Sequence, residues 1–324
     1  MTIELDGGWR TAEADWHNPT RLPQPAFLLN VPLSLVAEEV SRGDEEEPAD
    51  AAPGARPPLD RHRAMSQFLE LYRDLTADAL VYLLPTPRLS GLRDLARAAH
   101  LGVVLEHLPS GDVVVLARGA TRERRAAVEV GRSFFESLGY RVVEPVGRFE
   151  GEADLKHLRD DVYVGGYGAG TGPEVHDWLE RAFDLRVVRL RVADPTLPHL
   201  DRTVLPLTRE RTLVCVEAHD RDEIRRLERH TEVVPVSASA CRAGLCASVR
   251  VDNTILNASH LHQLRPGSAE HAAELAKNRA LEDAAAPLAL EVNHVNLSEF
   301  AGAGVALSSL VLHLNRYSYR FELM

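Results

Sequence analysis

The sequence has few cysteines, few aromatic residues and no long apolar run. Three cysteines in 324 residues are an odd and low number, which argues against a secreted disulfide scaffold and favours a reducing cytoplasm. The longest apolar stretch, residues 300–314, is interrupted by glycine and serine and is shorter than the about 20 residues of a transmembrane helix. The amino terminus has no basic region followed by an apolar one, so we expect no signal peptide and a soluble, cytoplasmic protein.

Positive charge is also scarce. Lys and Arg number 37 against 48 Asp and Glu, a formal net charge of −11 at pH 7. An acidic chain is a poor partner for nucleic acid and for an anionic membrane surface. We therefore expect a small-molecule partner, no nucleic acid and no membrane, and a homo-oligomer is left open. Hydrophobic residues make up 45% of the chain, enough for a core without a disulfide or metal.

The chain is long enough for two domains or for one domain built from repeats. Helical patterns centre near residues 70, 130, 178, 225 and 276, about 50 residues apart, as in a supersecondary repeat. The unit is strand, strand, helix, strand, and a last strand over residues 304–314 would complete the first unit. A closed ring of five such units would solve the edge-strand problem by radial repetition. The alternative is an ordinary mixed α/β sheet.

These units predict a single domain over residues 1–324. Residues 41–59 contain an acidic run and several prolines but almost no apolar side chains. Such a segment cannot bury a core, so we expect an acidic, proline-rich loop within the domain.

Three polar segments lie next to predicted strands. They are FEGEAD at 149–154, DPTLPHLD at 194–201 and LSEF at 297–300. In a ring of repeats the loops near the axis converge, so residues that are far apart in sequence can share one pocket.

In this order and spacing the three segments resemble the guanidino-group-modifying enzymes, which include dimethylarginine dimethylaminohydrolases (dimethylargininases), arginine deiminases and amidinotransferases. The resemblance extends from about residue 61 to the end of the chain. It implies a five-bladed pseudosymmetric α/β propeller (pentein-like) of ββαβ repeats. It also implies an amidinotransferase- or amidinohydrolase-like enzyme of arginine metabolism, acting on a guanidino (arginine-like) or related amidino compound, without a cofactor.

The resemblance assigns a role to each matching residue. Asp154 and Asp201 match the carboxylates that bind the substrate, because a carboxylate can hold a planar guanidinium by two hydrogen bonds. His199 matches the acid/base histidine, which protonates the leaving amine. The alternative is that these residues have no catalytic role. His199 would then be a surface histidine in a proline-rich loop, and the two aspartates would be turn or cap residues.

The sequence departs from the family at two positions. Ser309 stands where the family has its nucleophilic cysteine, with Ser308 as the neighbouring alternative, and no cysteine follows Cys246. A serine hydroxyl is a poor nucleophile without a base to remove its proton, and Ser309 could equally be a small residue packed in a core strand. Gly170 stands where the family has an arginine. The chemistry is therefore altered, or the protein is a catalytically degenerate member with a binding or regulatory role.

Cysteines, histidines and glycines elsewhere in the sequence raise the alternatives of a relocated nucleophile, a metal site and a nucleotide site. Cys246 could be a relocated nucleophile, but a buried apolar cysteine fits better. The potential metal ligands fit none of the tight zinc patterns, and we expect no metal site; they are His260, His262, His271, His294, Cys241 and Cys246. The glycine-rich residues 165–171 lack a nucleotide-binding pattern and favour a tight turn.

Overall fold

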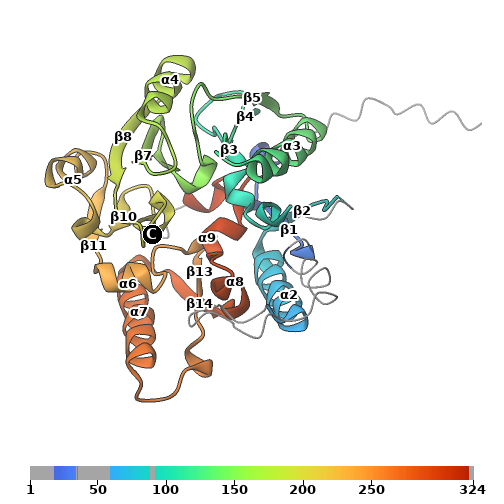
Figure 1. Ribbon diagram of the computed structural model, residues 1–324. Helices are drawn as coiled ribbons and strands as arrows, with labels where there is room; N and C mark the ends of the chain where they lie inside the picture. The colour runs from blue at the N-terminus through green and yellow to red at the C-terminus, as the bar shows by residue number, and fades with distance from the viewer. Residues whose placement is uncertain (1–17, 34, 36–58, 88–91, 321–324) are drawn as a thin grey trace, which may run out of the picture.

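The computed structural model describes residues 18–33, 35, 59–87 and 92–320. These residues form five three-stranded sheets around a common centre, with helices α2, α3, α4, α5 and α7 at the periphery (Figure 1). This is the five-bladed α/β propeller that the repeat spacing predicts. Residues 41–58 of the expected acidic loop lie outside the described part of the chain.

Each blade has the order strand, strand, helix, strand. The first comprises β15 (Leu312–His313), β1 (Ala26–Asn30), α2 (Arg61–Asp78) and β2 (Leu80–Leu84). The second comprises β3 (Gly102–Val104), β4 (Val113–Leu116), α3 (Arg122–Ser137) and β5 (Arg141–Val143). The third comprises β6 (Leu155–Arg159), β7 (Val162–Gly168), α4 (Pro173–Phe183) and β8 (Arg186–Val192). The fourth comprises β9 (Val204–Pro206), β10 (Arg211–Val214), α5 (Arg221–Leu227) and β11 (Glu232–Pro235). The fifth comprises β12 (Val249–Val251), β13 (Thr254–Ala258), α7 (Ala269–Ala285) and β14 (Glu291–Val295).

The pairing of the strands follows from their connections. The first strand of each blade, called here the inner strand, pairs antiparallel with the second, and the second pairs parallel with the third. A parallel pair needs a crossover, which the helix supplies. Side-chain caps start these helices: Asp60 accepts a hydrogen bond from the Arg63 amide at α2, and Thr121 caps α3.

The C-terminal strand closes the first blade, as predicted. β15 pairs antiparallel with β1, with His313 opposite Phe27. The continuous strand expected over residues 304–314 is wrong, however, because the chain forms the short helix α9 (Leu307–Leu310) before β15. A short apolar run is compatible with both strand and helix periodicity, so the pattern alone does not decide between them.

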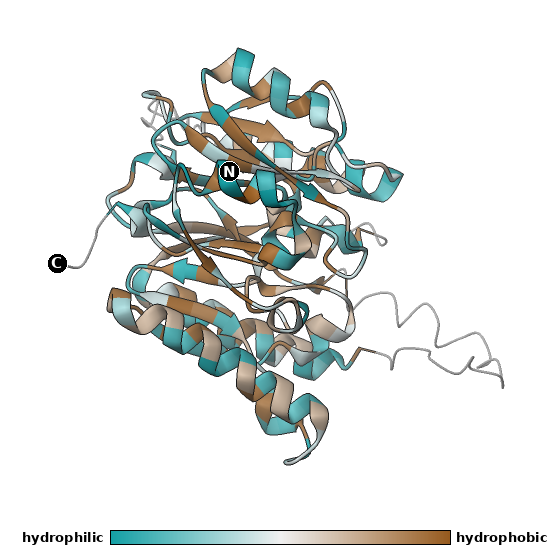
Figure 2. Ribbon diagram, turned by 90° about the vertical axis from the view of Figure 1, so that its left-hand side faces the viewer, coloured by the Kyte–Doolittle hydropathy of each residue, from teal (hydrophilic) through white to brown (hydrophobic). Residues whose placement is uncertain are grey.

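The core joins neighbouring blades. Phe27 of β1 and Leu71 of α2 share one apolar cluster with Val249 of β12 and Val295 of β14. Figure 2 shows the hydrophobic strands between helices whose outer faces are largely hydrophilic. This burial of apolar surface is the main stabilising contribution. Within the described ranges, no helix has the length and apolar character needed to cross a lipid bilayer.

Candidate active site

The polar residues of interest lie in short turns directly before the inner strands. The turns are η3 (Ala98–His100) before β3, η4 (Gly151–Ala153) before β6, η5 (Leu200–Arg202) before β9 and α9 before β15. Since the inner strands surround the axis, these turns meet at one end of it. The structure thereby brings Asp154, His199, Asp201 and Ser308 together.

Asp154 holds the neighbouring turn in place. Its side chain is 2% exposed. Oδ1 accepts a hydrogen bond of 3.0 Å from the Leu200 amide and lies 3.5 Å from His199 Nδ1, while Oδ2 accepts one of 2.7 Å from Thr171 Oγ1. Both oxygens are therefore engaged. The carboxylate lies at ion-pair distance from His199, whose Nδ1 has no hydrogen-bond partner among the described residues.

Only one of the two carboxylate oxygens of Asp201 accepts a hydrogen bond from the described residues. Asp201 is fully buried, and Oδ2 accepts a 2.6 Å hydrogen bond from the hydroxyl of Ser308. Oδ1 is buried without a hydrogen-bond partner among the described residues. A buried carboxylate oxygen is costly to leave unpaired, so this atom is suited to a ligand donor. Ser309 follows Ser308 in α9, and its side chain is also buried.

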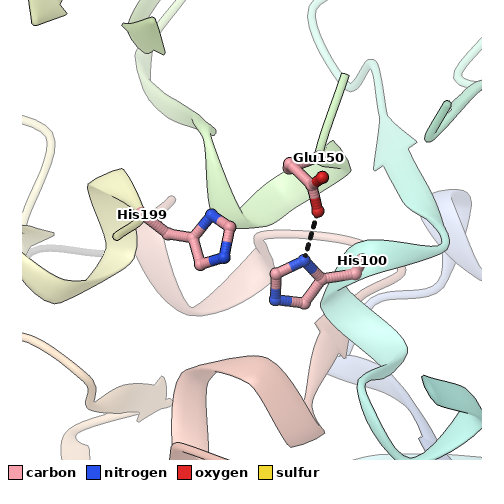
Figure 3. Close-up of side chains that lie close together, drawn as sticks. All are labelled: His100, Glu150 and His199. Atoms are coloured by element: carbon pink, nitrogen blue, oxygen red, sulfur yellow. Dashed lines mark hydrogen bonds and ion pairs between the residues drawn. The ribbon is translucent and has the colours of Figure 1, made fainter. Parts of the chain in front are cut away.

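His100 and Arg124, which the sequence analysis did not single out, complete the site together with Glu150 of the FEGEAD segment. Figure 3 shows His100 and Glu150 beside His199. His100 Nδ1 lies 3.0 Å from Glu150 Oε2, and the rings of His100 and His199 meet edge to face with 4.7 Å between centroids. Arg124, from α3, donates to the same oxygen of Glu150, and its Nε lies 3.2 Å from Asp94 Oδ2. His100 lies two residues before the inner strand β3, much as Asp154 lies just before β6, and this position was the only available signal.

The two histidines have opposite pKa perturbations. Burial lowers the pKa of His100, and the hydrogen bond to Glu150 offsets this only in part. Burial would also lower the pKa of His199, but the carboxylates of Asp154 and Asp201 outweigh it, so its pKa is raised. Burial would raise the pKa of Glu150, yet His100 and Arg124 hold it at about 2. The site thus pairs a neutral imidazole with one that keeps its proton more readily.

The tautomer of His100 depends on two neighbours of Nδ1. Glu150 Oε2 lies 3.0 Å away and favours a proton on Nδ1, whereas the N–H donor of Arg124 Nη1 lies 2.9 Å away and favours a proton on Nε2. If Nδ1 carries the proton, both His100 and Arg124 donate to the Glu150 carboxylate, which makes two charge-assisted hydrogen bonds. Nε2 is then an acceptor. It is buried without a hydrogen-bond partner among the described residues. η3 packs against α9, which carries Ser308 and Ser309.

Two glycines make room for this arrangement. Gly151 has a φ of +66°, and a Cβ there would lie 2.8 Å from the carbonyl oxygens of Ala99 and Gly102, so only glycine lets η4 pack this closely. A Cβ on Gly170 would lie 2.7 Å from Glu150 Cγ. We expected a tight turn over the glycine-rich residues 165–171. The first four of them instead belong to β7, which continues to Gly168.

The site does not suit a metal ion. His100, Glu150 and His199 offer ligand atoms within 4.8 Å of one another. However, the Arg124 guanidinium already places a positive charge there, donating to Glu150 and lying 2.9 Å from His100 Nδ1. Among the described residues, the histidines and cysteines weighed from sequence form no such group.

Cys246 lies in the core rather than among the site residues. Its Sγ is 3.7 Å from that of Cys241, and both side chains are buried among apolar residues. The contact with Cys241 and burial raise the pKa of Cys246 well above its usual value. A thiol that stays protonated is a poor nucleophile.

Comparison with known proteins identifies relatives. No protein-family model matches the sequence. The bifunctional arginine dihydrolase/ornithine cyclodeaminase AgrE of Nostoc sp. is 29% identical over 261 residues, which cover 78% of this chain and 34% of AgrE. The N(G),N(G)-dimethylarginine dimethylaminohydrolase of Mycobacterium tuberculosis is 32% identical over 119 residues, 37% of either chain. The chain spans about a third of the length of the bifunctional relatives.

Solved structures extend the likeness to the fold. The N-terminal domain of ArgZ, an arginine dihydrolase from cyanobacteria, matches with a TM-score of 0.71 and 24% identity in a cysteine-to-serine mutant bound to substrate. The match covers 90% of this chain and 98% of that domain. In sequence the chain is similar to arginine dihydrolases and to a dimethylarginine dimethylaminohydrolase, and in fold it is similar to the ArgZ domain.

Proposed function

We propose that the protein is an amidinohydrolase-like enzyme that acts on the guanidino group of arginine or a methylated arginine. One observation supports this most directly: two histidines with opposite pKa perturbations lie side by side, next to a buried carboxylate with a free oxygen. Such a separation of pKa values is typical of an acid and a base that work together. The AgrE and ArgZ relatives are named arginine dihydrolases, which supports the same substrate class.

Asp201 binds the guanidinium in this proposal. Its unpaired Oδ1 accepts a hydrogen bond from a substrate N–H, and its charge complements the cation. Asp154 acts mainly by orienting His199, since its own oxygens are already engaged. Arg97 lies close enough to Asp201 and Glu150 for their charges to act on it, and its side chain, like that of His199, is partly exposed.

The two histidines divide the proton transfers. His100, with Nδ1–H donating to Glu150, accepts a proton at Nε2 from the attacking hydroxyl as its oxygen bonds to the guanidino carbon. His199 then donates its proton to the departing nitrogen as the C–N bond breaks. If the attacking hydroxyl is that of Ser309, water next adds to the guanidino carbon of the adduct and gives a proton to the now neutral His199. The C–O bond to Ser309 then breaks as its oxygen takes back the proton from His100. Each transfer by a positioned side chain contributes about 10²- to 10⁴-fold to the rate. His100 is thus our proposed base, a group that the sequence analysis did not identify, and its turn η3 packs against α9, which carries Ser309.

A turnover assay with mass-spectrometric detection tests the proposal. The full chain is incubated with arginine, methylated arginines and agmatine, with and without an acceptor amine. We expect citrulline- or ornithine-type products, which fall at least about 100-fold in H199N and D201N and are unchanged in H260N. His260 is a matched control, since it is a partly exposed histidine that lies near Glu274 and outside the site.

Absence of product from the wild-type chain across all substrates would refute hydrolysis of these compounds and favour a binding or regulatory role. Retention of activity in H199N would refute only the proposed role of His199 and not the proposed reaction. The S309A variant identifies the attacking oxygen: loss of turnover and of a covalent adduct in the intact-protein mass assigns it to Ser309, whereas unchanged turnover assigns it to water.

A further inference from the structure

The propeller axis has a second end, opposite the candidate active site. The inner strands begin at the active site, so their C-terminal ends converge on the other face. A cavity of about 240 Å³ lies there. Its charged lining comes from the residues that end or follow β3, β6, β9 and β15, namely Glu106, Arg159, Asp160, Arg209, Arg316 and Arg320.

This cavity has an excess of positive charge in an acidic protein. Four arginines line it against two carboxylates, although the chain as a whole has a net charge of −11. Arg209 pairs with Asp160, and Arg320 lies 3.6 Å from Glu106. The positive field also acts on the buried His157, whose pKa is lowered to about 3, first by burial and then by the charge of Arg316.

Arg316 is the best-placed donor in the cavity. It is 7% exposed, and its guanidinium stacks on the ring of Tyr319 at 3.9 Å from the centroid. Stacking fixes the orientation of the planar group at little further entropic cost. One of its nitrogens, Nη2, is buried without a hydrogen-bond partner among the described residues. A buried, charged donor in this state is stabilised by any ligand that brings an oxygen to it.

A paired layer separates the two ends of the axis. Glu152, in η4, accepts hydrogen bonds from the backbone amide and from Nδ1 of His313, the latter at 2.6 Å, and lies 3.5 Å from Lys156. Glu152 is thus hydrogen-bonded within its own layer. The charge of Arg316 acts on Glu152 and on Glu106, but Nη2 of Arg316 has no hydrogen-bond partner among the described residues.

We propose that this cavity binds a small doubly charged oxyanion of the phosphate class, either free or as a phosphomonoester. The oxyanion accepts hydrogen bonds from Arg316 Nη2 and from the guanidinium of Arg209 at the rim. Arginine forks suit tetrahedral oxyanions because two N–H groups meet two oxygens. The proposal is independent of the activity proposed for the opposite end.

Isothermal titration of the full chain with inorganic phosphate, at constant ionic strength, tests this site. We expect saturable binding that weakens about tenfold in R316K, which keeps the charge but removes Nη2, and about tenfold in R209Q. R225K and R225Q are matched controls, because Arg225 is a surface residue of α5 whose side chain is 72% exposed and pairs with Asp222. A second titration with glycerol phosphate distinguishes a phosphomonoester site from a site for the free ion.

The titrations distinguish a specific oxyanion site from non-specific binding. Loss of binding in R316K and R209Q with retention in the Arg225 variants supports the site. If R316K fails to fold, R209Q alone still decides. The proposal is overturned by no binding up to about 20 mM phosphate, where counter-ion effects become dominant. Equal binding of chloride, or equal weakening in the Arg225 variants, overturns it as well.

Discussion

Replacing Glu150 with glutamine should destabilise the protein in a pH-dependent way. Glutamine keeps the shape and one oxygen of the side chain but removes the charge that His100 and Arg124 stabilise. It therefore mimics the protonated acid. Because the pKa is held at about 2 rather than at the ordinary 4.5, the charged form contributes about 3 kcal/mol to the free energy of unfolding at neutral pH. E150Q should lose about this amount.

The pH dependence provides the sharper test. A depressed carboxyl pKa stabilises the fold fully above the unfolded pKa of about 4.5 and loses that effect as the pH falls toward the folded pKa. The difference between wild type and E150Q should therefore shrink from about 3 kcal/mol at pH 7 to about 1.5 kcal/mol at pH 3. Urea denaturation at the two pH values measures it directly.

E129Q is the matched control for this measurement. Glu129 is also a glutamate paired with an arginine, Arg132, but its side chain is 64% exposed. An exposed pair contributes about 0.5 kcal/mol or less, so E129Q should have little effect at either pH. A loss in E150Q below about 1 kcal/mol at pH 7, or one that is the same at pH 3, would contradict the electrostatic argument.

Three further predictions concern the site. G170A adds a methyl group too close to the neighbouring glutamate side chain and should cost about 1–3 kcal/mol of stability, seen as a lower midpoint of thermal unfolding. S308A leaves the buried Asp201 without its hydroxyl donor and should cost about 2 kcal/mol, whereas S309A should be close to neutral in the same urea titration. Since His199 must be protonated to act as the acid and its pKa is raised above 6.5, kcat/KM should fall only as the pH rises well above 6.5; a fall that begins below pH 6.5 contradicts this role.

The repeat architecture could be predicted from the sequence because helix spacing is a local and periodic signal. Five amphipathic helices at similar intervals specify five blades, and the spare C-terminal strand specifies how the ring closes. Strands of two or three residues carry too little periodicity to be seen alone. This limitation explains why residues 304–314 were predicted as one strand, although α9 and β15 divide them.

The site could be predicted only in part. Asp154, His199 and Asp201 lie in segments that resemble a known family, so we could expect them to lie close together. In the structure both aspartates lie next to His199. His100 and Arg124 come from other segments and meet Glu150 only through contacts between blades. No local pattern marks such residues, because their environment is created by the tertiary fold.

The departure from the family at Gly170 is best understood together with Glu150 and Arg124. The space that a side chain at Gly170 would occupy is taken by Glu150, which in turn binds a guanidinium supplied by α3. Gly119 opens the path for that guanidinium, since a Cβ there would lie 2.0 Å from Arg124 Cγ. The space next to Gly170 is thus filled by a matched set of a glutamate, an arginine and two glycines, as expected if the site that we propose is a functional one.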